Sequence, residues 1–278
     1  MITGRSRSNT RTSASMYKYR HLIWNFTQRD LKSKFQGTSL GWAWSLIVPL
    51  ATVIIYTVVF GVVFRAQPPA FGNGREGIFA VWFFAGLVPW GIFSASATGG
   101  MPSLLSTGPL LQKIYIPSYV PVLGAVGAIF IQGLIEFGIL GALLAGFGDV
   151  GWTWLAFPLW LLLFIGFCAG FAVILAIFNV YFRDLGQITT VLLQLMFFMC
   201  PIIYTVDFIP VDFHGIPLRT ILTANPIAQF IITLREILYE AHLPSLSQLL
   251  YLAAWTAVML GIAVLVFRRW GRDVGEEM

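Results

Sequence analysis

Charged residues are scarce in this chain of 278 residues: they make up 10% of it, whereas hydrophobic residues make up 58%. A soluble domain usually carries about 25% charged residues. Asp, Glu, Lys and Arg are all absent from Val150 to Phe182, and a helix of roughly 20 apolar residues already crosses a bilayer. The scarcity of charge excludes a single water-soluble core and predicts an all-α polytopic membrane protein.

Cysteine, histidine and lysine are also rare, and each scarcity excludes a class of site. Cys168 and Cys200 both lie in apolar runs, which excludes a disulfide framework and favours small core residues. His21, His214 and His242 lie outside the apolar runs and belong to no metal-binding motif. None of the four lysines follows a glycine-rich phosphate loop. We therefore expect no metal, nucleotide or other cofactor to bind to this chain.

Six apolar stretches are present, and each is long enough to cross a bilayer as a helix. They cover residues 40–64, 78–100, 120–147, 152–178, 185–206 and 246–267. Together they predict a six-helix transmembrane domain over residues 37–267. Six crossings place both termini on the same side of the membrane.

The distribution of Lys and Arg indicates which side that is. Eight of these residues precede Leu40. Lys113, Arg183, Arg268, Arg269 and Arg272 lie in loops or the tail on that same side. Arg65, Arg75, Arg219 and Arg235 lie in loops on the opposite side. Thirteen of the seventeen therefore mark one side, which predicts cytoplasmic termini and a cytoplasmic tail at residues 268–278.

The basic segment before the first span divides into two parts. Residues 1–16 are rich in Ser, Thr and Arg, and we expect them to be disordered. Residues 17–36 are expected to form an amphipathic helix at the cytoplasmic interface, with apolar residues on two faces and basic residues between them. Such a helix suits contact with both lipid and protein, and a plain anchor on anionic lipid is the alternative.

Two further segments are expected to be neither spans nor simple loops. Pro102, Pro109 and Pro117 interrupt residues 101–118, which predicts a cytoplasmic elbow with one short helix around Leu104–Ile114. Residues 225–240 begin with a helix-starting Asn-Pro pair and are too short to cross a bilayer. That second helix is expected to dip into the membrane and return, or to lie on its surface.

One carboxylate lies deep within a predicted span. Glu136 follows Gln132 by one helical turn, so the two side chains share a face of the third span. An ionised carboxylate in hydrocarbon costs several kcal/mol, and no lysine or arginine within the spans offers itself as its partner. A functional role and a hydrogen bond that packs two helices both remain open.

Arg183 and Asp184 stand together between the fourth and fifth predicted spans. Their position predicts an ion pair at a short cytoplasmic turn. The pair either marks the turn, with its charges at the membrane surface, or provides a contact for a soluble partner.

Aromatic residues make up 15% of the chain. Seven of them lie within the predicted spans: Tyr56, Phe60, Phe79, Phe83, Phe93, Phe197 and Phe198. Such residues could contact a sugar, because an aromatic face stacks on the apolar face of a sugar ring. The alternative interpretation is that each of them packs in the core or against lipid.

A set of positions in fixed order resembles one known family. The matching positions are Arg29, Asp30, Lys34, Phe35, Leu40, Gly41, Trp44, Pro49, Lys113, Pro117, Asn179, Arg183, Asp184, Pro201, Ile202, Tyr204, Asn225 and Pro226. In order and spacing they resemble ABC-type polysaccharide and teichoic-acid exporter permeases, of the Wzm and TarG/TagG kind. The resemblance extends from about Tyr17 to the end of the chain.

The resemblance implies a fold and a set of partners. The fold would be six transmembrane helices with an N-terminal interface helix, a cytoplasmic coupling helix and short extracytoplasmic re-entrant helices. Two copies would form a homodimer around a channel in the cytoplasmic (inner or plasma) membrane of a bacterium. Two separate nucleotide-binding subunits would bind ATP and Mg and would dock from the cytoplasm. The cargo would be an O-antigen, galactan or teichoic-acid type polymer on a polyprenyl-diphosphate lipid, with membrane lipid around the protein and no nucleic-acid partner.

The resemblance also assigns roles to residues. It implies docking on the ATPase subunits by Arg29, Asp30, Lys34, Leu111, Lys113, Ile114, Arg183 and Asp184. It implies a channel lined by Tyr56, Phe60, Phe79, Phe83, Phe93, Phe197, Phe198 and Tyr204. It places Asn225, Pro226 and Arg235 in a re-entrant segment near an outer gate. Within this reading, the Arg183–Asp184 pair holds its turn rigid and transmits ATPase motion to the fifth span.

Two other classes of function remain as alternatives. A membrane-embedded enzyme acting on lipid-linked sugars needs several carboxylates or histidines at one interface, and the sequence offers no such group. A secondary carrier using Glu136 is the second alternative, although such carriers usually need several intramembrane charges.

Overall fold

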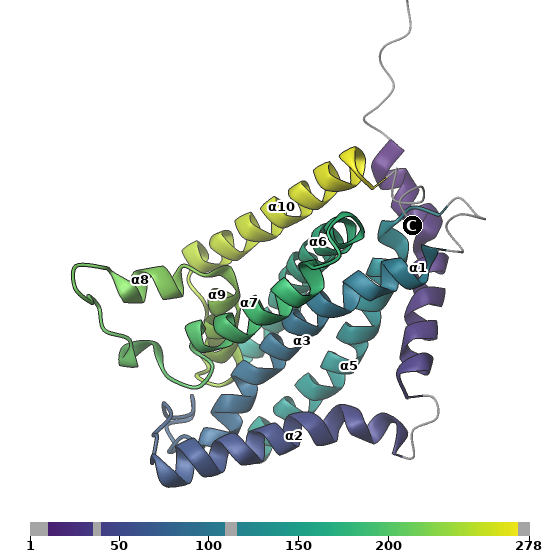
Figure 1. The fold of residues 1–278 in the computed structure, drawn as a ribbon. Coiled ribbons are helices and arrows are strands. Elements are labelled where there is room, and N and C mark those ends of the chain that lie inside the picture. The colour runs from purple at the N-terminus through teal and green to yellow at the C-terminus, as the bar shows by residue number, and fades with distance from the viewer. Residues whose placement is uncertain (1–10, 36–39, 109–115, 272–278) are drawn as a thin grey trace, which may run out of the picture.

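The computed structural model describes residues 11–35, 40–108 and 116–271 (Figure 1). Apart from one isolated bridge between Phe213 and Ile216, the regular structure in these ranges is helical. The longer elements are α1 (Arg11–Phe35), α2 (Trp44–Tyr56), the π-helical turns η2 (Thr57–Val63), α3 (Phe79–Ser106), α5 (Tyr119–Gly146), α6 (Phe157–Tyr181), α7 (Leu185–Met199), α9 (Pro226–Leu238) and α10 (Leu246–Arg269). The shorter ones are η1 (Gly41–Ala43), η3 (Trp152–Ala156), η4 (Val206–Phe208) and α8 (Leu218–Thr223).

Five helices in the described ranges are long and apolar enough to cross a membrane. They cover Leu46–Val63, Phe79–Ser106, Tyr119–Gly146, Trp152–Tyr181 and Leu246–Arg269. These helices correspond to the first, second, third, fourth and sixth spans predicted from the sequence. The all-α membrane class is therefore supported, and the fifth predicted span is the one that differs.

The fifth predicted span, residues 185–206, contains a helix of only 15 residues, α7. At about 1.5 Å per residue this helix is roughly 22 Å long, shorter than the hydrocarbon layer of about 30 Å. It ends because Pro201 follows Cys200, and the residue before a proline is driven out of the helical region. Cys200 accordingly has the extended angles φ −85° and ψ 144°.

The centre of the bundle is α3, which packs against α5, α6 and α9, while α6 packs against α10 (Figure 1). Small residues allow some of these close approaches, as they often do in membranes. A Cβ added at Gly170 of α6 would lie 2.9 Å from the backbone of Met259 in α10. The Gly166–Gly170 pair thus packs two helices of the same chain together.

The first span stands apart from this bundle. Only 6% of the Leu46–Val63 window is buried, against 72% for the window in α3. Figure 1 shows α2 running along the edge of the bundle, away from α6 and α10. Its continuation is the π-helical segment Thr57–Val63, a geometry that is rare and frequent at functional sites. Most of this span is therefore left for lipid or for another protein.

Two boundaries differ from the sequence predictions. The helix α3 continues through Pro102 to Ser106, so the prediction that this proline ends the span is wrong. A proline is tolerated in a membrane helix when neighbouring helices and local adjustments of the backbone accommodate it, and α3 is packed against both α5 and α6. The helix α1 begins at Arg11, before the predicted start of the interface helix at residue 17; residues 1–10 lie outside the described ranges.

Candidate functional site

A cavity of about 410 Å³ lies between α2, α3 and α7. We call it the aromatic groove. Its lining consists of Tyr56 from α2, Trp90, Ser94, Ala95 and Thr98 from α3, and Thr190, Leu193, Gln194, Phe197 and Phe198 from α7. The groove therefore combines four aromatic rings with four hydroxyls, including that of Tyr56, and one amide.

The polar side of the groove on α3 is a single stripe. Trp90, Ser94 and Thr98 follow one another at intervals of four residues, so they lie above one another on one face of the helix. The Ser94 hydroxyl donates to the Gly91 carbonyl, and the Thr98 hydroxyl donates to the Ser94 carbonyl. These bonds satisfy the hydroxyl protons within the helix and leave oxygen lone pairs for a ligand.

The aromatic side of the groove is arranged around Phe197. Its ring lies 6.1 Å from Tyr56 and 5.7 Å from Trp90, both in edge-on geometry, and 5.3 Å from Phe198. Phe83 stacks behind Tyr56 at 4.7 Å and supports its ring. Rings held in this way present apolar faces beside hydroxyl and amide groups, which is the combination that a sugar ring requires.

The predicted channel aromatics divide into two groups. Tyr56, Phe197 and Phe198 reach the groove, and Phe60 is partly buried beside Tyr56. The Tyr204 hydroxyl donates to the Phe198 carbonyl. By contrast, Phe79, Phe83 and Phe93 are 6%, 0% and 1% exposed.

The prediction that Phe79, Phe83 and Phe93 line a channel is therefore wrong. Phe93 packs against Phe167 and Phe171 of α6. In α3 nearly every face is covered by a neighbouring helix, so most of its aromatics belong to the core. Trp90 was not among the predicted channel residues, although it lines the groove. The four-residue spacing of Ser94 and Thr98 indicates a polar face on this helix.

A second cavity is lined by the intramembrane polar residues Gln132 and Glu136. The Lys34 ammonium at the end of α1 donates to the Gln132 side-chain oxygen at 2.7 Å and interacts electrostatically with Glu136. The basic group near Glu136 thus comes from outside the predicted spans, where the sequence analysis did not look for a partner. Partial burial lowers the pKa of the Lys34 ammonium, and the Glu136 carboxylate counteracts this lowering. Lys34, predicted to contact an ATPase subunit, is instead bonded to a membrane helix.

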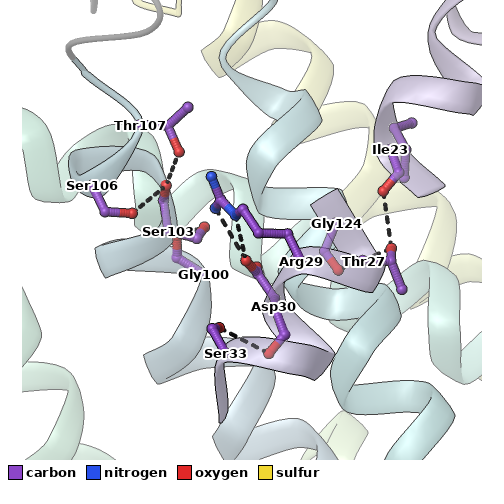
Figure 2. A network of polar contacts seen from close by, with 10 residues as sticks. All are labelled: Ile23, Thr27, Arg29, Asp30, Ser33, Gly100, Ser103, Ser106, Thr107 and Gly124. Atoms are coloured by element: carbon purple, nitrogen blue, oxygen red, sulfur yellow. Dashed lines mark hydrogen bonds and ion pairs between the residues drawn. The ribbon is translucent and has the colours of Figure 1, made fainter. Parts of the chain in front are cut away.

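The helix α1 is fixed to α5 by a close contact. The Thr27 hydroxyl donates to the Gly124 carbonyl at 3.1 Å, and Phe26 is 5% exposed. A Cβ added at Gly124 would lie 2.4 Å from the Phe26 Cβ, so only glycine permits this approach. Figure 2 shows Thr27 directed at Gly124, and Arg29 folded onto Asp30 of its own helix at 3.0 Å.

The predicted docking residues have different outcomes. Arg29 is 46% exposed and Asp30 is 22% exposed, so both remain accessible to a partner. Leu111, Lys113 and Ile114 lie outside the described residues. Arg183 and Asp184 are exposed at the turn between α6 and α7.

The predicted ion pair between Arg183 and Asp184 is absent from the described part of the chain, where ion pairs join Arg29 to Asp30 and Arg219 to Asp207. The turn is held by backbone bonds instead, from Phe182 N to Phe178 O and from Leu185 N to Phe182 O. Adjacent side chains at a tight turn point in different directions, and water solvates both charges at little cost.

The helix α9 begins as the sequence predicts. The Asn225 side chain accepts from the Ile227 amide at 3.0 Å, and Pro226 occupies the first turn. The helix is then buried against α3, α6 and α10.

Arg235 fixes α9 to its neighbours. Its guanidinium is 4% exposed and donates to the carbonyls of Trp82, Pro201 and Ile202. It thereby joins α9 to α3 and to the turn that follows α7. The sequence placed Arg235 in the outer segment but gave no indication of these three acceptors.

Within the described residues, no three His, Cys, Asp or Glu side chains lie close enough together to hold a metal ion. Both cysteines are buried and unbridged. The arrangement thus offers binding surfaces and no constellation for catalysis in this part of the chain.

Comparison with known proteins agrees with this picture. The ABC-2 type transporter family profile matches residues 21–239. The O-antigen export system permease protein RfbA of Myxococcus xanthus is 30% identical over 95% of this chain and 97% of its own length. RfbA of Klebsiella pneumoniae is 28% identical over 86% of this chain and 88% of its own length, and the polysialic acid transport protein KpsM of Escherichia coli is 24% identical over 86% and 90%. The chain belongs to the ABC-2 type transporter family.

Proposed function

We propose that this chain is the permease subunit of an ATP-driven exporter that moves a polysaccharide on a polyprenyl-diphosphate lipid across the bacterial cytoplasmic membrane. The relatives are named as permeases for O-antigen export and as a transport protein for polysialic acid. Two copies form the transport path, and two separate nucleotide-binding subunits supply the energy from ATP and Mg. The chain itself carries out transport and no catalysis.

The aromatic groove is the observation that carries this proposal. Its rings and hydroxyls suit an uncharged, hydroxyl-rich polymer, because sugar rings have apolar faces and polar edges. Most of the wall comes from α3 and α7, and Tyr56 of the loosely packed first span closes one side. The groove therefore lies where a second copy and a passing polymer have access to it.

The proposed orientation places both termini and α1 on the cytoplasmic side. It requires that α7, together with the turn at Pro201–Tyr204, completes a sixth crossing. The distribution of lysine and arginine over the loops supports this orientation. The re-entrant assignment of α9 is supported by its burial among α3, α6 and α10 and by its length of 13 residues, too short to span.

The ATPase subunits are proposed to dock on the exposed residues at this side: Arg29, Asp30, Arg183 and Asp184. Through the Thr27–Gly124 contact, a force applied to α1 reaches α5 directly. The exposed face of α2 is proposed to contact the second copy. This contact would place the two aromatic grooves along a shared path.

Substitutions in the groove test the proposal in cells that depend on this permease. Gln194→Leu removes the amide at nearly constant size, and Phe197→Leu removes the ring. Both are expected to reduce surface polysaccharide several-fold and to cause lipid-linked polymer to accumulate inside the cell. Leu195→Ala on the exposed face of the same helix is the matched control and should export normally. Normal export by both groove variants would overturn the proposed path.

A further inference from the structure

A larger cavity, of about 500 Å³, lies next to the aromatic groove, against an adjoining face of α3. We call it the polar cavity. It is bounded by the end of α1, the start of α2 and the middles of α3 and α5, and Ala95 is the one residue that lines both it and the groove. Its walls are formed by Lys34, Trp44, Val48, Pro49, Thr52, Leu87, Gly91, Ile92, Ala95, Ile129, Gln132, Gly133 and Glu136.

The polar groups of this cavity are gathered on one wall. Lys34 and Gln132 are bonded at 2.7 Å, and Glu136 follows Gln132 by one turn. The opposing walls from α2 and α3 are mostly apolar. A charge of each sign therefore stands beside a surface that suits hydrocarbon.

The cavity lies where the chain passes from α1 into its first span. The first span covers the cavity only loosely, since most of its residues are exposed. A molecule in the surrounding membrane thus has access to the cavity from the side. A space of this size between helices, with a few convergent polar groups, has the character of a small-molecule site.

The charges restrict what the occupant is. With Lys34 protonated and Glu136 ionised, the pair carries no net charge, so an anionic headgroup would gain from Lys34 and lose from Glu136. A free sugar would leave the apolar walls without contact. A zwitterionic lipid whose headgroup carries a phosphate and a hydrogen-bonding ammonium satisfies both charges, and its chains cover the apolar walls.

We propose that the polar cavity binds an aminophospholipid, with the headgroup phosphate on Lys34 and the headgroup ammonium on Glu136. Gln132 then positions Lys34. The bound lipid fills the space beneath the first span and holds α2 against α3 and α5. This inference rests on the family's membrane location and is independent of which polymer is exported.

A series of three lipids tests the proposal. The purified full chain, stripped of lipid in detergent, is titrated with phosphatidylethanolamine, phosphatidylcholine and phosphatidylglycerol, and bound lipid is counted by native mass spectrometry. Phosphatidylethanolamine is expected to bind at least about tenfold more tightly than the other two, because a hydrogen bond to a charged group contributes that much. Phosphatidylcholine lacks the donor protons, and phosphatidylglycerol lacks the ammonium. Equal binding of all three lipids, or tighter binding of phosphatidylglycerol, overturns the proposal.

Two charge variants locate the site. Glu136→Gln and Lys34→Met should each abolish the preference for phosphatidylethanolamine. Lys32→Met removes the same charge from an exposed position on α1 that does not line the cavity, and it should keep the preference. A preference that survives in Glu136→Gln contradicts the assignment of the ammonium.

A steric variant tests the cavity with both charges intact. A Cβ added at Gly91 meets nothing within 4 Å, so Gly91→Leu fills the space while α3 retains its packing. Gly138 of α5 is equally open but lies outside the cavity, so Gly138→Leu is the control. Gly91→Leu should lose the tightly bound lipid, whereas Gly138→Leu should retain it. Binding unchanged in Gly91→Leu, in protein with an unaltered melting temperature, places the lipid elsewhere and overturns the proposal.

Discussion

The guanidinium carbon of Arg235 lies 3.7 Å from the centroid of the Trp82 ring, and the same guanidinium donates to the Trp82 carbonyl. Further bonds reach the carbonyls of Pro201 and Ile202. A buried arginine that bonds to backbone carbonyls holds segments together without needing a carboxylate. The proline that ends α7 leaves its neighbouring carbonyls without helical partners, and Arg235 supplies the donors that they need.

Arg235→Lys is expected to destabilise the protein by about 3 kcal/mol, because a lysine ammonium loses the ring stacking and reaches fewer of the three carbonyls. The loss should appear as a lower melting temperature in detergent. Arg219→Lys is the control, since Arg219 also bonds to carbonyls but at the surface. Gly86→Ala should resemble Arg235→Lys, because a Cβ at Gly86 would lie 2.3 Å from Arg235 Nη2. Unchanged melting in both core variants would contradict the role of Arg235.

Gly124→Ala is expected to force α1 away from α5. The added methyl would overlap the Phe26 Cβ, and overpacking of this kind costs about 1–3 kcal/mol. The Thr27–Gly124 bond would lengthen as well. Distance measurement between spin labels on α1 and α5 should show a broader, longer distribution, and export should fall. Gly138→Ala, at an open position of the same helix, should change neither; an unaltered distance in Gly124→Ala would show that the contact is dispensable.

Asp184→Ala is expected to reduce export while leaving assembly of the proposed dimer intact. Because Asp184 is exposed and makes no side-chain cap to α7, the substitution removes a surface charge without disturbing the turn. Export and co-purification with the ATPase subunit are the two measurements. Glu76→Ala, in another exposed loop, serves as the control. Undiminished export in Asp184→Ala would remove Asp184 from the docking surface.

The sequence predicts five of the six spans because hydropathy and length largely determine where a long apolar helix forms. It fails where a neighbouring helix decides the outcome. The helix α3 continues through Pro102 inside a packed bundle, and Phe83 belongs to the core because α3 is covered on nearly all sides. A periodic pattern contains no information about which helices surround a given face.

The partner of Glu136 could not be found by searching within the spans. Lys34 lies roughly a hundred positions away, in a helix assigned to the membrane surface, and only the packing of α1 on α5 brings them together. The same holds for the groove, where the rings of α7 meet the hydroxyl stripe of α3. The predicted pair at Arg183–Asp184 failed for the opposite reason, because neighbours in sequence need not point at one another.

Reconstitution in liposomes tests the central claim most directly: that this chain is a transport path driven by a separate ATPase. Vesicles containing the chain together with its nucleotide-binding subunit are loaded on one face with lipid-linked polysaccharide, and its appearance on the other face is measured with and without ATP. We predict ATP-dependent movement only when both subunits are present, and no nucleotide hydrolysis by the chain alone. Hydrolysis of ATP or transport of the polymer by the isolated chain would contradict the account.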